Sequence, residues 1–257
     1  MNKRIRLDKY LSDMEIGTRS QVKQYIKKKQ VQVNGTYPSG VEQKVMPDID
    51  VITFRGQNIT YVKYKYFLFY KPKGCVSAVT DNYHKTVLDY FENDKKNGLF
   101  PVGRLDIDTE GLLLLTNNGD FAHNLLSPKK HVPKVYFAKV SGKVTEEDVI
   151  CFSKGVDIGE EKLTLPAELK ILSRSEITRN QVILPKSEVE QNQILWISEI
   201  ELTITEGKFH QVKRMFEAVG KKVLYLKRIS IGDLKLDETL NPGEYRALTE
   251  EELKKLL

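Results

Sequence analysis

A carboxylate held between glycines, directly before a run of leucines, is the feature of this chain that most suggests chemistry. Asp106 lies within the segment 103–111, which reads GRLDIDTEG and precedes Leu112–Leu115. Thr116–Gly119 follows the leucines, so they predict a buried strand that ends in a turn. The core would then hold the preceding loop still, as a positioned catalytic group requires. From spacing alone, capping a turn is the more common role for such an aspartate.

A second segment carries a cation that needs a partner. Residues 206–220 predict a turn and then a helix that Gly220 ends. Lys213 stands beside the apolar positions, so we expect it to be half-buried and paired with a carboxylate that it keeps ionised. The buried stripe is expected to consist of Phe209, Val212, Phe216 and Val219.

Three further segments would surround such a site. An aromatic strand over Tyr66–Tyr70 stops at Lys71-Pro72-Lys73-Gly74, whose lysines could contact phosphates or simply form a charged turn. Asp120 is expected to cap a short helix over Phe121–Leu126. Residues 134–140 alternate as a strand, in which Tyr136 is either a core residue or a flat ring on which a base could stack.

Composition narrows the class of protein. The chain has 257 residues and a net charge of +6, and residues 1–60 hold 11 Lys and Arg against 6 Asp and Glu. This uneven charge favours a polyanionic partner, with nucleic acid first. No apolar run is long enough for a membrane span and the N-terminus lacks a signal sequence, so we expect a cytoplasmic protein. The two cysteines and four histidines have no metal-ligand spacing, and we expect no metal and mostly ordinary histidines.

The basic N-terminal part predicts a small module. Thr18 and Gln21 form a capping box that opens a helix to about Lys28. Residues 31–33 alternate and meet Asn34-Gly35, a hairpin signal. Residues 54–65 are expected to be a linker, with the first domain ending near residue 60. One face of the helix is basic, formed by Arg19, Lys23 and Lys27.

These motifs resemble two known families. Residues 6–11, 18–20 and 31–35 are similar to the S4 RNA-binding domain over about 55 residues. The GRLD block, the KPKG turn, Lys134-Val135-Tyr136 and His210-Gln211-Val212-Lys213 resemble the RsuA/RluB/RluE/RluF branch of pseudouridine synthases, and residues 227–232 and 242–248 resemble its ending. Residues 173–196 depart from the family's pattern and are expected to form a surface excursion.

The resemblance implies an α+β protein, with a small N-terminal S4 (αL-like) domain over 1–60. A catalytic domain over 61–257 would carry a mixed, mainly antiparallel sheet and an active-site cleft. It implies Asp106 as nucleophile, Tyr136 stacked on the target base and Lys213 paired with Asp106. Asp108 and Glu110, as loop or strand-end residues, are expected only to cap and solvate. Expected RNA contacts are Arg104, Lys71, Lys73, Arg19, Lys23 and Lys27, where Arg104 could instead brace the loop by a salt bridge.

The expected reaction is isomerisation of one uridine in ribosomal RNA, by a cytoplasmic monomer without cofactor or metal. The chain stops soon after residue 246, without the long basic extension of large-subunit relatives, so 16S rRNA (pseudouridine-516 type) is preferred to 23S rRNA. Two rival functions are a non-catalytic S4-domain RNA-binding factor associated with ribosomes and a glycosidase. The first leaves Asp106, Tyr136 and Lys213 unexplained, and the second normally needs another positioned acid.

Overall fold

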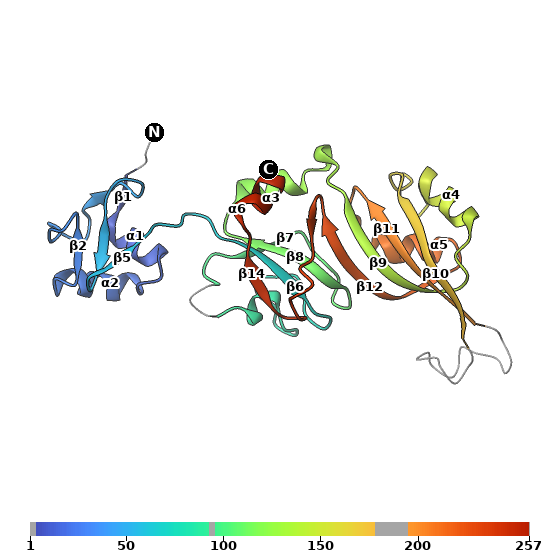
Figure 1. The fold of residues 1–257 in the computed structure, drawn as a ribbon, viewed down its shortest axis with the longest axis horizontal. Helices are drawn as coiled ribbons and strands as arrows, with labels where there is room; N and C mark the ends of the chain where they lie inside the picture. Colours follow the sequence, from blue (N-terminus) through green and yellow to red (C-terminus); the bar gives the residue numbers. More distant parts are fainter. Residues whose placement is uncertain (1–3, 93–95, 178–194, 257) are drawn as a thin grey trace. The chain divides into compact units, whose positions relative to one another are not determined.

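The chain forms two compact units, Met1–Lys65 and Tyr66–Leu257 (Figure 1). The computed structural model describes residues 4–92, 96–177 and 195–256. The first unit extends past the boundary expected near residue 60, because the last residues of this unit contact the end of α1 and the turn that follows it. The Tyr61 hydroxyl donates to Asp13 (2.9 Å), and Lys65 forms an ion pair with Glu15.

The first unit packs two helices against short strands. The capping box of Thr18 and Gln21 forms as predicted and starts α2, which buries Val22 and Ile26. The Asn34-Gly35 turn forms with both residues at positive φ, but it closes a single bridge between Val33 and Thr36. The elements are β1 (Ile5–Arg6), α1 (Leu7–Asp13), α2 (Arg19–Lys27), β2 (Val31–Val33), β3 (Lys44–Val45), β4 (Ile52–Phe54) and β5 (Gln57–Ile59).

Two expectations for this unit were therefore wrong. The strand partner of β2 is β4, some twenty residues along the chain, rather than the residues after the Asn-Gly turn. Part of the expected linker is β5, which pairs with β4. Both errors arise because pairing across a sheet depends on which apolar faces meet, and a local turn signal does not encode that.

The second unit is built on a mixed, mainly antiparallel sheet, as expected. Within the described residues the sheet has nine strands, in the order β10-β11-β9-β12-β8-β6-β14, with β13 on β12 and β7 on β8. The strands are β6 (Tyr66–Lys71), β7 (Phe100–Val102), β8 (Glu110–Thr116), β9 (Lys134–Ser141), β10 (Glu168–Ile177), β11 (Leu195–Ile204), β12 (Lys222–Ile231), β13 (Leu234–Lys235) and β14 (Tyr245–Ala247). The α-helices are α3 (Gly119–Leu126), α4 (Glu146–Lys154), α5 (Gln211–Ala218) and α6 (Glu250–Leu256), and 3-10 turns cover Val87–Tyr90 and Pro128–Lys130.

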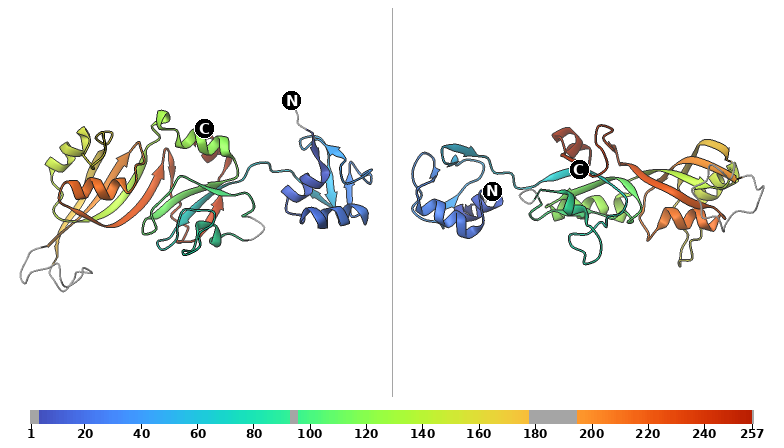
Figure 2. Two further views of the ribbon diagram at one scale, coloured as in Figure 1. Left: turned by 180° about the vertical axis from the view of Figure 1, so that it is seen from behind. Right: turned by 90° about the horizontal axis from the view of Figure 1, so that it is seen from below.

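Both faces of β8 are buried, which explains its run of leucines. Leu113 and Leu115 join the larger core cluster, which also contains the buried apolar residues of α5. Leu112 and Leu114 face the opposite way and pack with α3 and α6. Figure 2 shows α5 lying across one face of the strands. The predicted strand is thus confirmed, and its burial fixes the loop that precedes it.

Helix α3 starts earlier than predicted. Its N-cap is Asn118, whose side-chain oxygen accepts from the amide of Phe121 (3.2 Å), and Asp120 stands in the first turn instead. Residues 173–177 and 195–196 of the expected surface excursion belong to the paired strands β10 and β11. The rest of it, residues 178–194, lies outside the described residues. No helix in the described part of the chain is both long and apolar enough to cross a membrane.

The sheet opens where β8 meets β12. These two strands run parallel and share only the pairs Lys227–Glu110 and Arg228–Gly111. Gly111 has a φ of +106°, and a Cβ there would lie 2.2 Å from the backbone oxygen of Arg228. Only glycine permits this close approach. The opening beyond it is the place where the sequence-predicted site residues meet.

Candidate active site

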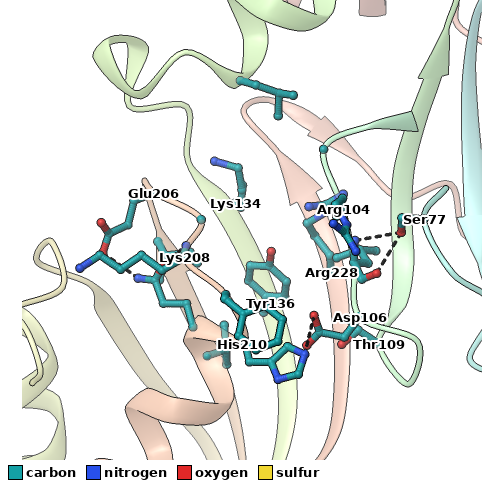
Figure 3. A pocket seen from close by; sticks show the side chains of 18 of the residues that line it. Ser77, Arg104, Asp106, Thr109, Lys134, Tyr136, Glu206, Lys208, His210 and Arg228 are labelled. Carbon is teal, nitrogen blue, oxygen red and sulfur yellow. Dashed lines mark hydrogen bonds and ion pairs between the residues drawn. The ribbon is translucent and has the colours of Figure 1, made fainter. Parts of the chain in front are cut away.

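A pocket of about 650 Å³ lies at this opening. It is lined by the Asp106 loop, by β9 and β12, and by the turn and first residues of α5. Figure 3 shows Asp106, Tyr136 and His210 together, with Lys134, Lys208, Arg104 and Arg228 around them. The structure therefore brings Asp106, Tyr136, Lys213 and Arg104 into one cavity, although they are spread over more than a hundred residues of sequence.

The Asp106 loop is braced from below by the KPKG turn. The ammonium of Lys71 donates to the backbone oxygens of Asp106 (3.0 Å) and Thr109 (2.9 Å), and Gly74 donates its amide to Ile107 (2.6 Å). Ser77 Oγ bonds both the amide and the carbonyl of Leu105, at 3.0 and 2.9 Å. These hydrogen bonds supply donors to backbone carbonyl oxygens that would otherwise be buried without a partner. The loop is therefore held in one well-defined shape.

The expected RNA contact by Lys71 was wrong. Its side chain is fully buried (0% exposed), and its donors are used by the loop carbonyls. Burial lowers the pKa of Lys71, and nearby carboxylates partly oppose this shift. Lys73, by contrast, is exposed and remains available to a phosphate. Two lysines in one turn look alike in sequence, and only the packing of the loop separates them.

The predicted ion pair between Asp106 and Lys213 is present, and it has a third member. Lys213 Nζ lies 3.1 Å from Asp106 Oδ2 and 2.6 Å from Asp108 Oδ1, and the lysine side chain is 19% exposed. Burial opposes its charge, but the two carboxylates outweigh burial and raise the pKa of Lys213. Partial burial likewise works against ionised Asp108, yet the bond from Lys213 keeps the pKa of Asp108 below its usual value. The expectation that Asp108 only caps or solvates the loop was wrong, because it holds the same cation as Asp106.

His210 is a site residue that the sequence did not single out. Its Nε2 lies 3.6 Å from Asp106 Oδ1 (Figure 3). The residue is the N-cap of α5 and adopts a left-handed backbone, φ +48°, which turns its ring toward the loop. Its position three residues before Lys213, near the helix start, was the available signal. The sequence predicted that most of the histidines are ordinary, and His210 is an exception to that majority.

Tyr136 and Arg104 present different surfaces to the pocket. Tyr136 is 7% exposed and belongs to the core cluster, as one alternative predicted; it also lines the cavity, and its stacking on a base stays a prediction. Arg104 is exposed at the pocket edge and forms no ion pair within the described residues. The salt bridge that would make it only a brace of the loop is therefore not seen there, and its charge faces the cavity.

Two more cations in the wall were not assigned roles from sequence. Arg228 is 3% exposed; its Nε donates to the backbone oxygen of Leu112 (2.8 Å), and its Nη2 is buried without a partner among the described residues. Burial lowers the pKa of Lys134, and the nearby positive charge of Arg228 lowers it further to a smaller extent. A wall with this many cations suits an anionic ligand.

The first unit carries a separate basic surface. Arg19, Lys23 and Lys27 are all exposed on α2, and we call this surface the α2 basic face. No acidic residue lies within α2 itself. The helix thus presents the predicted row of cations, and its buried side is formed by Val22 and Ile26.

Comparison with known proteins identifies the family. A family model described as RNA pseudouridylate synthase matches residues 65–218, and an S4 domain model matches residues 5–36. The chain belongs to the RNA pseudouridylate synthase family. This synthase is accordingly an isomerase that carries an S4 domain, as the sequence motifs predicted. The glycosidase and non-catalytic alternatives are set aside.

Relatives match the synthase over nearly its whole length. It is 42% identical over 250 residues to the uncharacterized RNA pseudouridine synthase YtzG of Bacillus subtilis (strain 168), covering 97% of each chain. It is 36% identical to the ribosomal small subunit pseudouridine synthase A of Haemophilus influenzae, covering 98% of this chain and 100% of the relative. A solved structure described as a pseudouridylate synthase aligns with a TM-score of 0.65 at 36% identity, over 98% of this chain and 100% of the other.

Proposed function

We propose that this synthase isomerises a specific uridine of 16S rRNA, of the pseudouridine-516 type, with Asp106 as the nucleophile. The observation that carries the proposal is the Asp106 carboxylate, braced by its loop and paired with Lys213 inside a cationic pocket. The small-subunit target is supported by the named activity of the Haemophilus influenzae relative, which matches this chain from end to end.

The reaction breaks the C1′–N1 bond of uridine and joins C5 to C1′ after the base has turned. N1 gains a proton and C5 loses one, so the product is an isomer and neither an oxidant nor a nucleotide is consumed. Ionised Asp106 starts the reaction either by attack on C1′ or by removal of a ribose proton. Lys213 keeps a positive charge beside this carboxylate, because the pKa of Lys213 is raised above its ordinary value of 10.5.

The places of the surrounding residues in the pocket support roles for them in binding the RNA. The target uridine must leave its stack to reach Asp106, which costs a few kcal/mol. The ring of Tyr136 in the pocket wall offers a surface for the base, and Arg104 at the edge is placed to hold the flipped nucleotide's backbone. Lys73 and the α2 basic face would add phosphate contacts that are independent of sequence.

The test combines a deletion strain with Asp106→Asn. Pseudouridine would be mapped across both rRNAs by carbodiimide-dependent primer extension, and one 16S site should disappear in the deletion strain and return with the wild-type gene. Asp106→Asn should not restore it, whereas Asp120→Asn, the same change on an exposed helix residue outside the pocket, should. A lost site in 23S rRNA would overturn the small-subunit target. Restoration by Asp106→Asn would overturn the role of Asp106.

A further inference from the structure

Phe209 is exposed at the mouth of the pocket, although its spacing in the sequence placed it on the buried stripe of the helix. The expectation was wrong for Phe209 because α5 begins at Gln211, so Phe209 precedes the helix. The core stripe consists of Val212, Met215 and Phe216, and Val219 packs against it. Its side chain is 74% exposed. A phenylalanine in that state contributes little apolar burial to the fold, so packing does not account for it.

The exposed ring is held in place rather than left loose. It stacks on the imidazole of His210, with centroids 3.8 Å apart and planes 19° apart. Its backbone oxygen accepts from Arg214 Nη1 (3.1 Å), and the same guanidinium forms an ion pair with Glu160 (2.7 Å). Lys208, on the other side, also pairs with Glu160 (3.2 Å). Lys208, which precedes Phe209 in the chain, and Arg214, which donates to its backbone oxygen, are thus both tied to one carboxylate.

A second set of bonds fixes the start of the helix. Gln211, which is buried, accepts from the amide of Lys208 (2.9 Å) and donates to Glu206 (2.8 Å). The turn 206–211 is therefore cross-linked on both sides of Phe209 and presents one face of the ring outward. A flat, rigid apolar face on a polar surface marks a site for a ligand that stacks.

The position of the exposed Phe209 face indicates which kind of ligand would stack on it. Phe209 is bonded to His210, whose ring contacts Asp106, and both residues line the pocket that holds Tyr136. Tyr136 is buried in the pocket wall, whereas Phe209 is exposed to solvent. Arg104, Lys134 and Arg228 line the same pocket. An exposed aromatic face on a pocket lined by cations fits a nucleobase whose own phosphates need neutralising.

We propose that Phe209 stacks on the base adjacent to the target uridine and thereby stabilises the RNA conformation in which the target has left its stack. His210 supports the ring from behind, so that Asp106 and the stacking platform are fixed relative to each other. This inference rests on the proposed function, because it takes the target uridine to lie on Asp106. It assigns a positioning role to Phe209 and no part in the bond changes.

The test uses a 16S rRNA fragment that contains the mapped uridine, with 2-aminopurine at the adjacent position. In the wild-type complex, stacking on Phe209 should quench the probe. Phe209→Ala should leave it bright and weaken binding or single-turnover rate by roughly 5- to 150-fold, the range for loss of one base–aromatic stack. Phe209→Trp should restore both signals. Phe209→Leu, which keeps bulk without a π face, should not.

A matched control is Tyr83→Ala, which removes another exposed aromatic ring (91% exposed) that does not line the pocket. It should change neither readout, and the melting temperature of Phe209→Ala should equal that of wild type. Binding and rate within twofold of wild type for Phe209→Ala would overturn the stacking role while the function stands. A wild-type protein that modifies no rRNA uridine would refute the proposed function itself, and the inference with it.

Discussion

Replacing Lys213 with methionine tests whether the ion pair at Asp106 is needed for the reaction. Methionine keeps the length of the side chain but removes its charge, which lies 3.1 Å from Asp106 and 2.6 Å from Asp108. At 3.1 Å the attraction of two unit charges is about 1.3 kcal/mol in water and about 5 kcal/mol at an effective dielectric constant near 20. Because the two side chains are 19% and 26% exposed, we place the loss at about 2 to 4 kcal/mol.

The interaction energy lost in Lys213→Met should lower the catalytic rate rather than the stability of the fold. A change of about 2 to 4 kcal/mol corresponds to a rate reduced about 30- to 900-fold if all of it acts on the reacting state. Tritium release from RNA labelled at C5 of uridine, measured under single-turnover conditions, would report it. Lys213→Arg should retain most activity, because the guanidinium can still pair with the carboxylates.

Lys221 provides the matched control. Its Nζ lies 2.8 Å from Asp148, and the two side chains are 14% and 8% exposed, so it forms a comparable pair outside the pocket. Lys221→Met should lower the melting temperature and leave the single-turnover rate unchanged. If Lys213→Met keeps a rate within threefold of wild type while folded, the ion pair has no role in catalysis. Equal rate losses in the two variants would show that the effect is one of stability.

Four other expectations follow from the structure. Asp108→Asn should lower the rate by less than about tenfold, because Lys213 can still pair with Asp106; a loss as deep as that of Asp106→Asn would contradict this. Lys71→Met should lower the melting temperature and the rate together, since several loop carbonyls lose their donor, and a normal melting curve would disprove the bracing role. Changing the three residues of the α2 basic face to Gln should reduce the slope of log K against log salt by about 2 to 3, if each meets one phosphate; an unchanged slope would remove that face from the interface. The pairing with Arg246 lowers the pKa of Glu252 to about 2 from its ordinary 4.5, so its stabilisation is complete above pH 4.5 and is lost as the pH falls toward 2. Urea unfolding should therefore show a smaller loss of stability over that range for Glu252→Gln than for wild type, and parallel losses would contradict the assignment.

Features encoded by neighbouring residues were determined by the sequence itself. The capping box of α2, the positive φ values of Asn34 and Gly35, and the buried leucine strand β8 depend on hydrogen bonds or periodicities within a few residues. The motifs also identified Asp106 and the cation that pairs with it. The partial burial of Lys213 could be inferred because this residue stands beside the apolar stripe of α5, and that holds whatever the stripe packs against.

Only the tertiary structure decided how similar residues divide into different roles. Lys71 is buried under the Asp106 loop while Lys73 is exposed, and Asp108 shares the cation that the family resemblance paired with Asp106 alone. Phe209 lies outside the helix stripe, and Arg228 faces the pocket because β12 approaches Gly111 of β8. In each case the deciding contact joins segments far apart in the chain. Local sequence specifies which residues can pair, but the register of the sheet and the packing of the loops select the pair that forms.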